Sequence, residues 1–286
     1  MPRYLLRLEY AGTRYRGWQI QTNARTVQGE IARAAGEVLN SSNFELYGSG
    51  RTDAGVHALE QVAHLDTAVK LAPAVLVDRL NALLPADINI LSAATVDRRF
   101  HARHSAIARA YLYQISRRRH AFLKPYVWWV REPLDIARMR DAASVFTGLH
   151  DFRAFSDDDP EEKSTKVQIE SLTIDEEGDL VLVRVAGSHF IRKMVRRIVG
   201  ILVEAGKGGL TRGEVEALLD PRPLKWRATL DPRPLKGRAT ADSDLPARLT
   251  APASGLFLER VTYPDHFQAT RIGMNASFHS ARVTRR

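Results

Sequence analysis

Cysteine is absent from the 286 residues of this chain, which excludes disulfides, thiolate zinc sites and cysteine nucleophiles together. Long hydrophobic runs are also absent, because no stretch approaches the roughly 20 apolar residues that a membrane helix needs. The N-terminal sequence has neither the apolar run nor the cleavage site of a signal peptide. We therefore expect a cytoplasmic protein that does not enter a membrane.

Hydrophobic residues make up 44% of the chain and charged residues 26%, as in globular proteins with a buried core. Lys and Arg number 42 against 33 Asp and Glu, for a net charge of +9. This charge favours polyanionic partners, although charge alone leaves a merely basic protein as an equal alternative. The grouping of the cations favours a phosphate-binding surface. The two groups are Arg98, Arg99, Arg103, Arg109, Arg117, Arg118 and Arg119, and then Arg192, Lys193, Arg196 and Arg197.

Hydrophobic periodicity predicts two successive halves of similar element order. In the first half we expect strands at residues 4–10, 44–47, 61–65 and 88–94 and helices at 27–39 and 74–83. This is the split βαβ order of a ferredoxin-like unit. In the second half we expect strands at 109–116, 168–174, 180–185 and 255–263 and helices at 136–146, 188–205 and 211–219.

These patterns predict an α+β protein in which two tandem ferredoxin-like halves, 1–104 and 105–265, share an extended antiparallel sheet with helices packed on it. A Pro- and Arg-rich insertion is expected at 220–245, where Asp220–Thr229 recurs as Asp231–Thr240. It is either a tandem duplication tolerated in a surface loop or an added basic RNA contact. Residues 266–286 are expected to form a basic tail.

The segment from Gly48 to His57 contains three glycines, which indicates a tight loop where backbone turns or approaches a ligand closely. Arg51 and Asp53 lie two positions apart and share a face of an extended chain. A neighbouring arginine favours the ionised carboxylate, which suits a nucleophile that needs no deprotonation. The alternative is an Asx turn with a surface ion pair. The segment taken alone favours that alternative.

With its surroundings, the segment resembles the signature of the tRNA pseudouridine synthase A family. Gly50–Ala58 is followed by Gln61–Asp66. Further blocks follow the family's order across residues 3–263, namely Tyr10–Gly12, Gly17–Gln21, Thr26–Gln28, Leu80–Pro85, Phe100–Arg103, Arg109–Tyr113, His150–Phe152, Met194–Arg196 and Ala251–Leu256. The resemblance implies the pseudouridine synthase fold and a homodimer. It also implies conversion of uridines 38, 39 and 40 of the tRNA anticodon arm to pseudouridine, without metal, nucleotide or redox cofactor.

The resemblance also implies roles for individual residues. Asp53 would be the nucleophile, attacking either ribose C1′ or uracil C6. Arg51 would fill the space left by the extruded uridine, because a stacked base hides the reacting atoms. Tyr111 would stack on the uracil and is a candidate for helping to remove the C5 proton, whereas Tyr113 is interpreted as a core residue. Arg196 would pair with Asp53.

Further positions are assigned with alternatives. Leu256 and the turn 251–255 are expected to form pocket wall. His57 is a substrate-binding candidate at the end of the motif, although it and His64 are also interpreted as parts of the scaffold. Arg192, at i−4 on the helix predicted for 188–205, is expected to share a face with Arg196.

Two groups of polar residues outside the motif could be taken for metal sites, but another interpretation is preferred for each. His101 and His104 lie three positions apart without a nearby acidic ligand, so RNA contact or packing is preferred. The run 157–162 is interpreted as a flexible acidic loop rather than a cation site.

Two rival functions remain. A catalytically inert tRNA-binding module on the same scaffold is disfavoured by the joint presence of Asp53, Tyr111 and Arg196. A glycoside hydrolase would need a second carboxylate beside Asp53, and none is evident.

Overall fold

The computed structural model describes residues 1–158, 164–219 and 244–267. Nearly all of the predicted duplicated insertion and the tail beyond residue 267 therefore lie outside the described residues. None of the described helices is long and apolar enough to cross a membrane.

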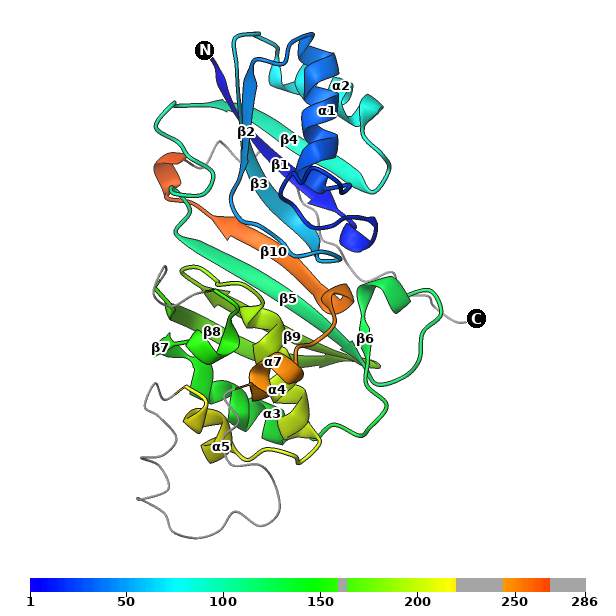
Figure 1. Cartoon of the computed structure of the whole chain (residues 1–286), viewed down its shortest axis with the longest axis vertical. Coiled ribbons are helices and arrows are strands. Elements are labelled where there is room, and N and C mark those ends of the chain that lie inside the picture. The colour runs from blue at the N-terminus through cyan, green and yellow to red at the C-terminus, as the bar shows by residue number, and fades with distance from the viewer. Residues whose placement is uncertain (159–163, 220–243, 268–286) are drawn as a thin grey trace.

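A ten-stranded sheet runs through the molecule, in the order β4-β1-β3-β10-β5-β9-β8-β7, with β2 paired to β3 and β6 to β5 (Figure 1). Its strands are β1 (Arg3–Tyr10), β2 (Phe44–Gly48), β3 (His57–Thr67), β4 (Ile88–Val96), β5 (Ala108–Ser116), β6 (Trp128–Trp129), β7 (Gly148–Asp151), β8 (Lys166–Glu177), β9 (Leu180–Gly187) and β10 (Leu256–Thr262). The α-helices are α1 (Val27–Leu39), α2 (Pro73–Leu83), α3 (Ile136–Ala143), α4 (Met194–Gly206), α5 (Arg212–Ala217) and α7 (Leu245–Arg248). The predicted α+β class is confirmed.

The strand β10 joins the two halves of the sheet. It is the last strand along the described chain, yet Figure 1 shows it between β3 and β5. Its pairing with β5 is antiparallel and its pairing with β3 is parallel. The predicted antiparallel sheet therefore has a parallel contact at its centre, and a second one between β5 and β6.

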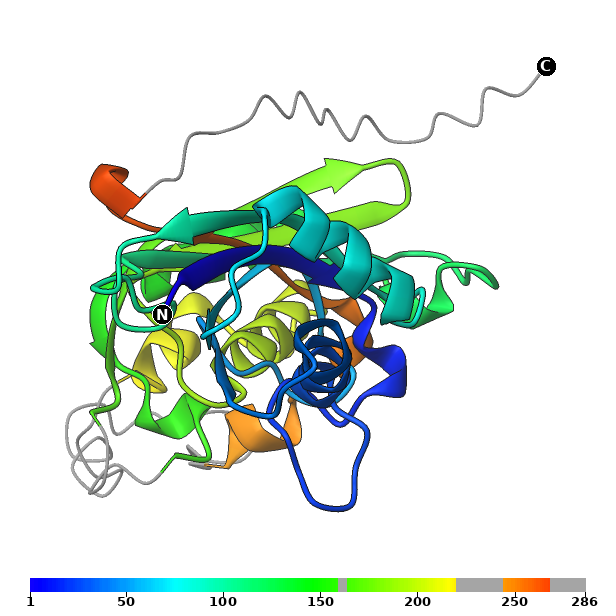
Figure 2. The same cartoon turned by 90° about the horizontal axis from the view of Figure 1, so that it is seen from above.

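Two large hydrophobic cores lie along the sheet, and each takes residues from the sheet's centre. One contains Trp18 of the N-terminal half and the inward faces of α1 and α2, and it also takes Leu258 from β10. The other packs α3 and α4 on the C-terminal strands and takes Val56 from the β2–β3 loop. A third, small cluster consists of Leu112, Leu182 and Phe257. Figure 2 shows α1 and α4 on the same side of the sheet. The centre of the sheet is thus tied to both cores.

Helix ends follow the local sequence in two places. Thr26 caps α1 by accepting a hydrogen bond from the Gly29 amide, and Asn40 ends the helix in the left-handed conformation. Thr211 and Glu214 form a capping box at the start of α5. In both helices the residue before the first turn therefore sets where the helix begins.

The helix predicted for residues 188–205 is shorter than expected, because α4 begins at Met194. Lys193, just before it, has a φ of 62° in the left-handed region, which helical backbone cannot accommodate. Phe190 and Arg192 therefore precede the helix, and the predicted shared helical face of Arg192 and Arg196 is wrong. The helix predicted for 136–146 also ends early, at Ala143, and continues as one 3-10 turn.

His64 gives the fold a dependence on pH. It is 1% exposed on β3, its Nδ1 accepts a hydrogen bond from the Ala102 amide, and burial lowers its pKa to about 4. In the unfolded chain His64 takes up a proton near pH 6.5, whereas in the folded chain it does so only near pH 4. The contribution of neutral His64 to the free energy of unfolding is therefore fully present above pH 6.5 and is lost as the pH falls toward 4. Urea unfolding at pH 7 and pH 5 measures the loss. The His64→Gln variant should lose less stability across this interval than wild type, whereas the exposed His266→Gln variant should match wild type; equal losses in all three would contradict the assignment.

Candidate active site

The loop between β2 and β3 carries Asp53 and is held by hydrogen bonds on its inner side. The Trp18 amide donates to the Thr52 carbonyl over 3.1 Å, and the Thr52 hydroxyl lies 2.8 Å from the Tyr10 hydroxyl. Gly55 turns the chain with a φ of 79°. Asp53 therefore lies on a backbone segment whose course is fixed by Tyr10 and Trp18 of the N-terminal core.

Two glycines from other blocks of the motif allow neighbouring backbone to approach this loop. A Cβ added to Gly12 would lie 1.9 Å from the Val56 carbonyl oxygen, and one added to Gly17 would lie 2.6 Å from that of Thr52. Side chains at either position would displace the loop. The blocks around residues 10–12 and 17–21 thus support the loop rather than the reaction itself.

His57 occupies the scaffold. It is 1% exposed, its Nδ1 accepts from the Gly12 amide over 3.1 Å, and its Nε2 donates to the Pro125 carbonyl over 3.0 Å. Its ring stacks on Phe257, and burial lowers its pKa. Both ring nitrogens are engaged with backbone, so this position does not support the predicted substrate contact.

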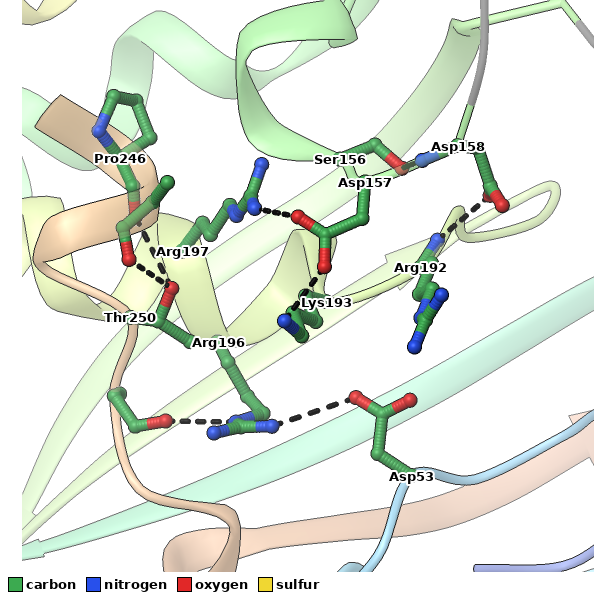
Figure 3. Close-up of polar contacts among 12 residues, drawn as sticks. Asp53, Ser156, Asp157, Asp158, Arg192, Lys193, Arg196, Arg197, Pro246 and Thr250 are labelled. Atoms are coloured by element: carbon green, nitrogen blue, oxygen red, sulfur yellow. Dashed lines mark hydrogen bonds and ion pairs between the residues drawn. The ribbon is translucent and has the colours of Figure 1, made fainter. Parts of the chain in front are cut away.

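Asp53 faces Arg196 across the two halves of the molecule (Figure 3). The Arg196 Nη1 lies 3.5 Å from the Asp53 Oδ2, with the two side chains 17% and 31% exposed. Arg196 is in the first turn of α4, and its Nε donates to the Ala251 carbonyl over 2.7 Å. The Ala251 amide donates back to the Arg196 carbonyl. The guanidinium is therefore held from one side by the 251–255 turn while it presents its other side to the carboxylate.

Arg51 is exposed on the same loop. It forms no ion pair with another residue of the described ranges, and Asp53 pairs with Arg196 instead. The alternative of a surface ion pair between Arg51 and Asp53 is therefore wrong. The guanidinium of Arg51 points to no protein partner in the described part of the chain.

Tyr111 lies on β5, in register with Leu258 of β10 and Val185 of β9. Its ring meets Phe190 edge-to-face, with the centroids 5.1 Å apart. Burial raises the pKa of Tyr111 to about 12, and the charge of Asp53 acts in the same direction against that of Arg109. The phenol is thus protonated at neutral pH and within electrostatic reach of Asp53. Sequence reasoning placed Phe190 on a helix and missed this contact.

The 251–255 turn is held by Tyr113. This tyrosine is fully buried and donates its hydroxyl to the Pro252 carbonyl over 2.7 Å, so its interpretation as a core residue is confirmed. Leu256 pairs with Tyr113 in the sheet and is 6% exposed within the C-terminal core. Ala253 of the turn approaches the β2–β3 loop, because a Cβ on Gly55 would lie 3.3 Å from it.

The second basic group is largely neutralised by protein carboxylates. Asp157 accepts from the Lys193 Nζ over 2.6 Å and from the Arg197 Nη2, and Arg197 is 5% exposed. With Arg196 facing Asp53, only Arg192 of the four is without an ion pair in the described ranges. The prediction that all four form a phosphate-binding surface is wrong. Asp157 is held by two ion pairs rather than lying in the predicted flexible acidic loop, and residues 159–162 of that loop lie outside the described residues.

The first basic group also includes a structural arginine. Arg109 donates to three backbone carbonyls, those of Ser188 at 3.0 Å, Ser49 at 3.2 Å and Arg103 at 2.9 Å. Burial lowers its pKa. The guanidinium therefore ties the start of the β2–β3 loop to the turn after β9, and it is not available to phosphate as predicted.

The histidines at 101 and 104 belong to a packed cluster. The His101 Nδ1 accepts from the Arg103 amide over 3.1 Å, and its ring lies 4.7 Å from that of His64. Within the described residues, no group of three or more His, Cys, Asp or Glu side chains is placed to bind a metal ion.

Sequence comparison identifies the family. A sequence model described as tRNA pseudouridine synthase matches residues 8–105 and 142–264. The chain belongs to the tRNA pseudouridine synthase family. The matched segments contain Asp53, Arg196 and Leu256, whereas Tyr111 falls between them. The predicted family and enzyme class, an isomerase, are confirmed.

Individual relatives agree with this assignment over most of the chain. tRNA pseudouridine synthase A of Aquifex aeolicus is 39% identical over 221 residues, covering 77% of this chain and 91% of the relative. The enzyme of the same name from Agrobacterium fabrum is 37% identical over 270 residues, covering 93% and 94%. tRNA pseudouridine synthase A 2 of Bacillus anthracis is 36% identical over 266 residues, covering 92% and 100%.

Proposed function

We propose that this protein converts uridines 38, 39 and 40 of the tRNA anticodon stem-loop to pseudouridine, with Asp53 as the nucleophile and no cofactor. The observation that carries the proposal is the meeting of Asp53 with Arg196 from the opposite half, 3.5 Å apart, with the partly buried Tyr111 nearby. The names of the relatives support tRNA as the substrate. The family resemblance supports the three positions.

The reaction is an isomerisation in which no electron or atom is gained. The bond from ribose C1′ to uracil N1 breaks, the bond from C1′ to C5 forms, the C5 proton leaves and N1 takes up a proton. The Asp53 carboxylate can attack C1′ or add to C6. Arg196 opposes its charge from one side and leaves about a third of the side chain exposed to a substrate. Arg51 is exposed on the loop, and we expect it to fill the space that an extruded base vacates in the RNA.

The Tyr111 hydroxyl is expected to serve the proton transfer and its ring the stacking. Because the phenol has a pKa of about 12, it is present as a hydrogen-bond donor rather than as a standing base. Tyr111→Phe keeps the ring and its contact with Phe190, so tRNA affinity should stay within about twofold while turnover falls by about 10²-fold, the scale of general acid–base assistance. Single-turnover tritium release from [5-³H]uridine-labelled tRNA measures this.

The matched control is Tyr4→Phe, which removes a hydroxyl bonded to the Leu71 carbonyl in the N-terminal core. This variant should turn over at the wild-type rate. Wild-type turnover in Tyr111→Phe would show that the hydroxyl has no part in proton transfer, and only the stacking role of the ring would remain.

Pseudouridine mapping tests the substrate assignment. Transcripts of one tRNA with uridine at 38, 39 or 40 alone should each be modified by the purified protein, and a transcript with none of the three should not. In cells, tRNA from a strain lacking the protein should keep uridine in the anticodon arm. Unchanged pseudouridine in those arms would overturn the assignment.

We also propose that the protein acts as a homodimer, as the family resemblance implies. Light scattering should then report a mass near twice the 32.1 kDa of one chain. A mass of one chain under assay conditions would contradict the dimer without affecting the assignment of Asp53.

A further inference from the structure

We propose that Asp157 is a positioning residue that holds the start of α4, and through it Arg196, against Asp53. The inference rests on the proposed function, since it concerns the partner of the proposed nucleophile. Asp157 lies after β7 and contacts α4 from a separate segment of the chain, as Figure 3 shows.

The contacts of Asp157 bracket Arg196 in the sequence. Its Oδ2 accepts from the Lys193 Nζ over 2.6 Å, and its Oδ1 accepts from the Arg197 Nη2. The neighbouring Asp158 adds a third contact, because its Oδ2 accepts from the Arg192 amide over 3.1 Å. One short acidic segment thus fixes the residues before and after Arg196 and leaves the Arg196 side chain free for Asp53.

The start of α4 needs such support for two reasons. Lys193 has a φ of 62°, a conformation that residues other than glycine rarely adopt unless neighbouring contacts maintain it. The first turn of α4 contains no acidic residue, while Lys193, Arg196 and Arg197 place three cations at the end of the helix where its dipole repels positive charge. Asp157 supplies the missing anion.

The burial of Arg197 determines how the loss of Asp157 would disturb α4. Arg197 is 5% exposed, its Nε has no hydrogen-bond partner among the described residues, and its Nη1 reaches the Ala154 carbonyl at 3.4 Å. A buried guanidinium without its carboxylate must move toward water or toward another anion. Either movement turns the first helical turn on which Arg196 lies, so loss of Asp157 should displace the Arg196 guanidinium from Asp53.

The experiment compares Asp157→Asn with wild type, below the melting transition of both. We expect kcat to fall at least about tenfold, while KM and the Kd for tRNA stay within about twofold, because the displaced group acts on the reacting carboxylate rather than on the RNA. Asp157→Glu keeps the carboxylate and should recover most of the lost kcat. Asp179→Asn is the matched control, since it makes the same charge change at a carboxylate paired with Arg118 on the β8–β9 turn, and it should leave kcat unchanged.

If Asp157→Asn does not fold, the double variant Asp157→Asn/Arg197→Met removes the buried cation together with its partner and should fold. Its kcat should still be low, because the carboxylate that neutralises Lys193 is absent. Wild-type kcat in either variant, a change confined to KM, or an equal loss in Asp179→Asn would each overturn the inference. Asp53→Asn is the reference. An inactive reference beside an active Asp157→Asn refutes only the positioning role, whereas an active reference refutes the proposed nucleophile and this inference with it.

Discussion

Asp53→Asn is expected to reduce turnover by on the order of 10³-fold or more, the scale seen when a group that acts directly in the chemistry is removed. The amide has the shape of the carboxylate but neither its charge nor its nucleophilic oxygen. The loop should keep its course, because Trp18 and Tyr10 hold it through Thr52 rather than through Asp53. The ion pair with Arg196 is partly solvated, so its loss should leave stability nearly unchanged.

Tritium release from [5-³H]uridine-labelled tRNA measures this loss, together with thermal unfolding of each variant. Asp53→Glu provides a second point. It keeps the charge but moves the carboxylate by about one bond, and a displacement of about 1 Å can cost about 10²-fold. Asp66→Asn is the matched control, since it removes another Arg-paired carboxylate from the same half, at 2.7 Å from Arg3, without touching the loop. Turnover retained in Asp53→Asn would refute the assignment of Asp53 as the nucleophile.

The N-terminal half could be predicted almost completely from the sequence. Its strands and helices are amphipathic with clear periods, and both ends of α1 are marked by residues whose side chains or φ angles act locally. The alternation of residues predicts the strand after the motif at 61–65, whereas β3 begins at His57. The residues before 61 pair with β1 and β10, and pairing between distant segments leaves no local pattern.

The centre of the sheet illustrates a different limit. The parallel pairing of β10 with β3 depends on the path of the chain through the whole C-terminal half, which periodicity does not encode. The short strands β6 and β7 were also missed, because segments of 2 and 4 residues are too short to show alternation.

In the candidate site, motif resemblance found Asp53 and Arg196, which the structure brings together, but it could not assign the surrounding arginines. Arg109, Arg196 and Arg197 are equivalent in a count of positive charge. In the structure, the first binds three backbone carbonyls, the second faces Asp53 and the third is buried against Asp157. The partner of each guanidinium, rather than its presence in a basic run, decides whether it can contact RNA.

The Arg196→Lys variant should show whether the shape of the guanidinium matters or only its charge. Arg196 uses Nε for the Ala251 carbonyl at 2.7 Å and Nη1 for Asp53 at 3.5 Å. A lysine has a single nitrogen on a flexible stem and cannot make both contacts in this geometry. We expect kcat to fall by about 10²-fold, the lower end for loss of one preorganised electrostatic contact, with KM within about twofold.

The matched control for this change is Arg184→Lys. Arg184 also uses its fork for two partners, Glu259 at 3.2 Å and Asp175 at 3.4 Å. It neighbours Val185 on β9, so its side chain leaves the sheet on the face opposite to that of the C-terminal core. Arg184→Lys should keep wild-type kcat. If both variants lose activity equally, the loss reflects the fold, and if Arg196→Lys is fully active, charge alone suffices beside Asp53. The predicted result, a loss confined to Arg196→Lys, requires that the two halves of the molecule meet through an arginine whose orientation is set by the 251–255 turn.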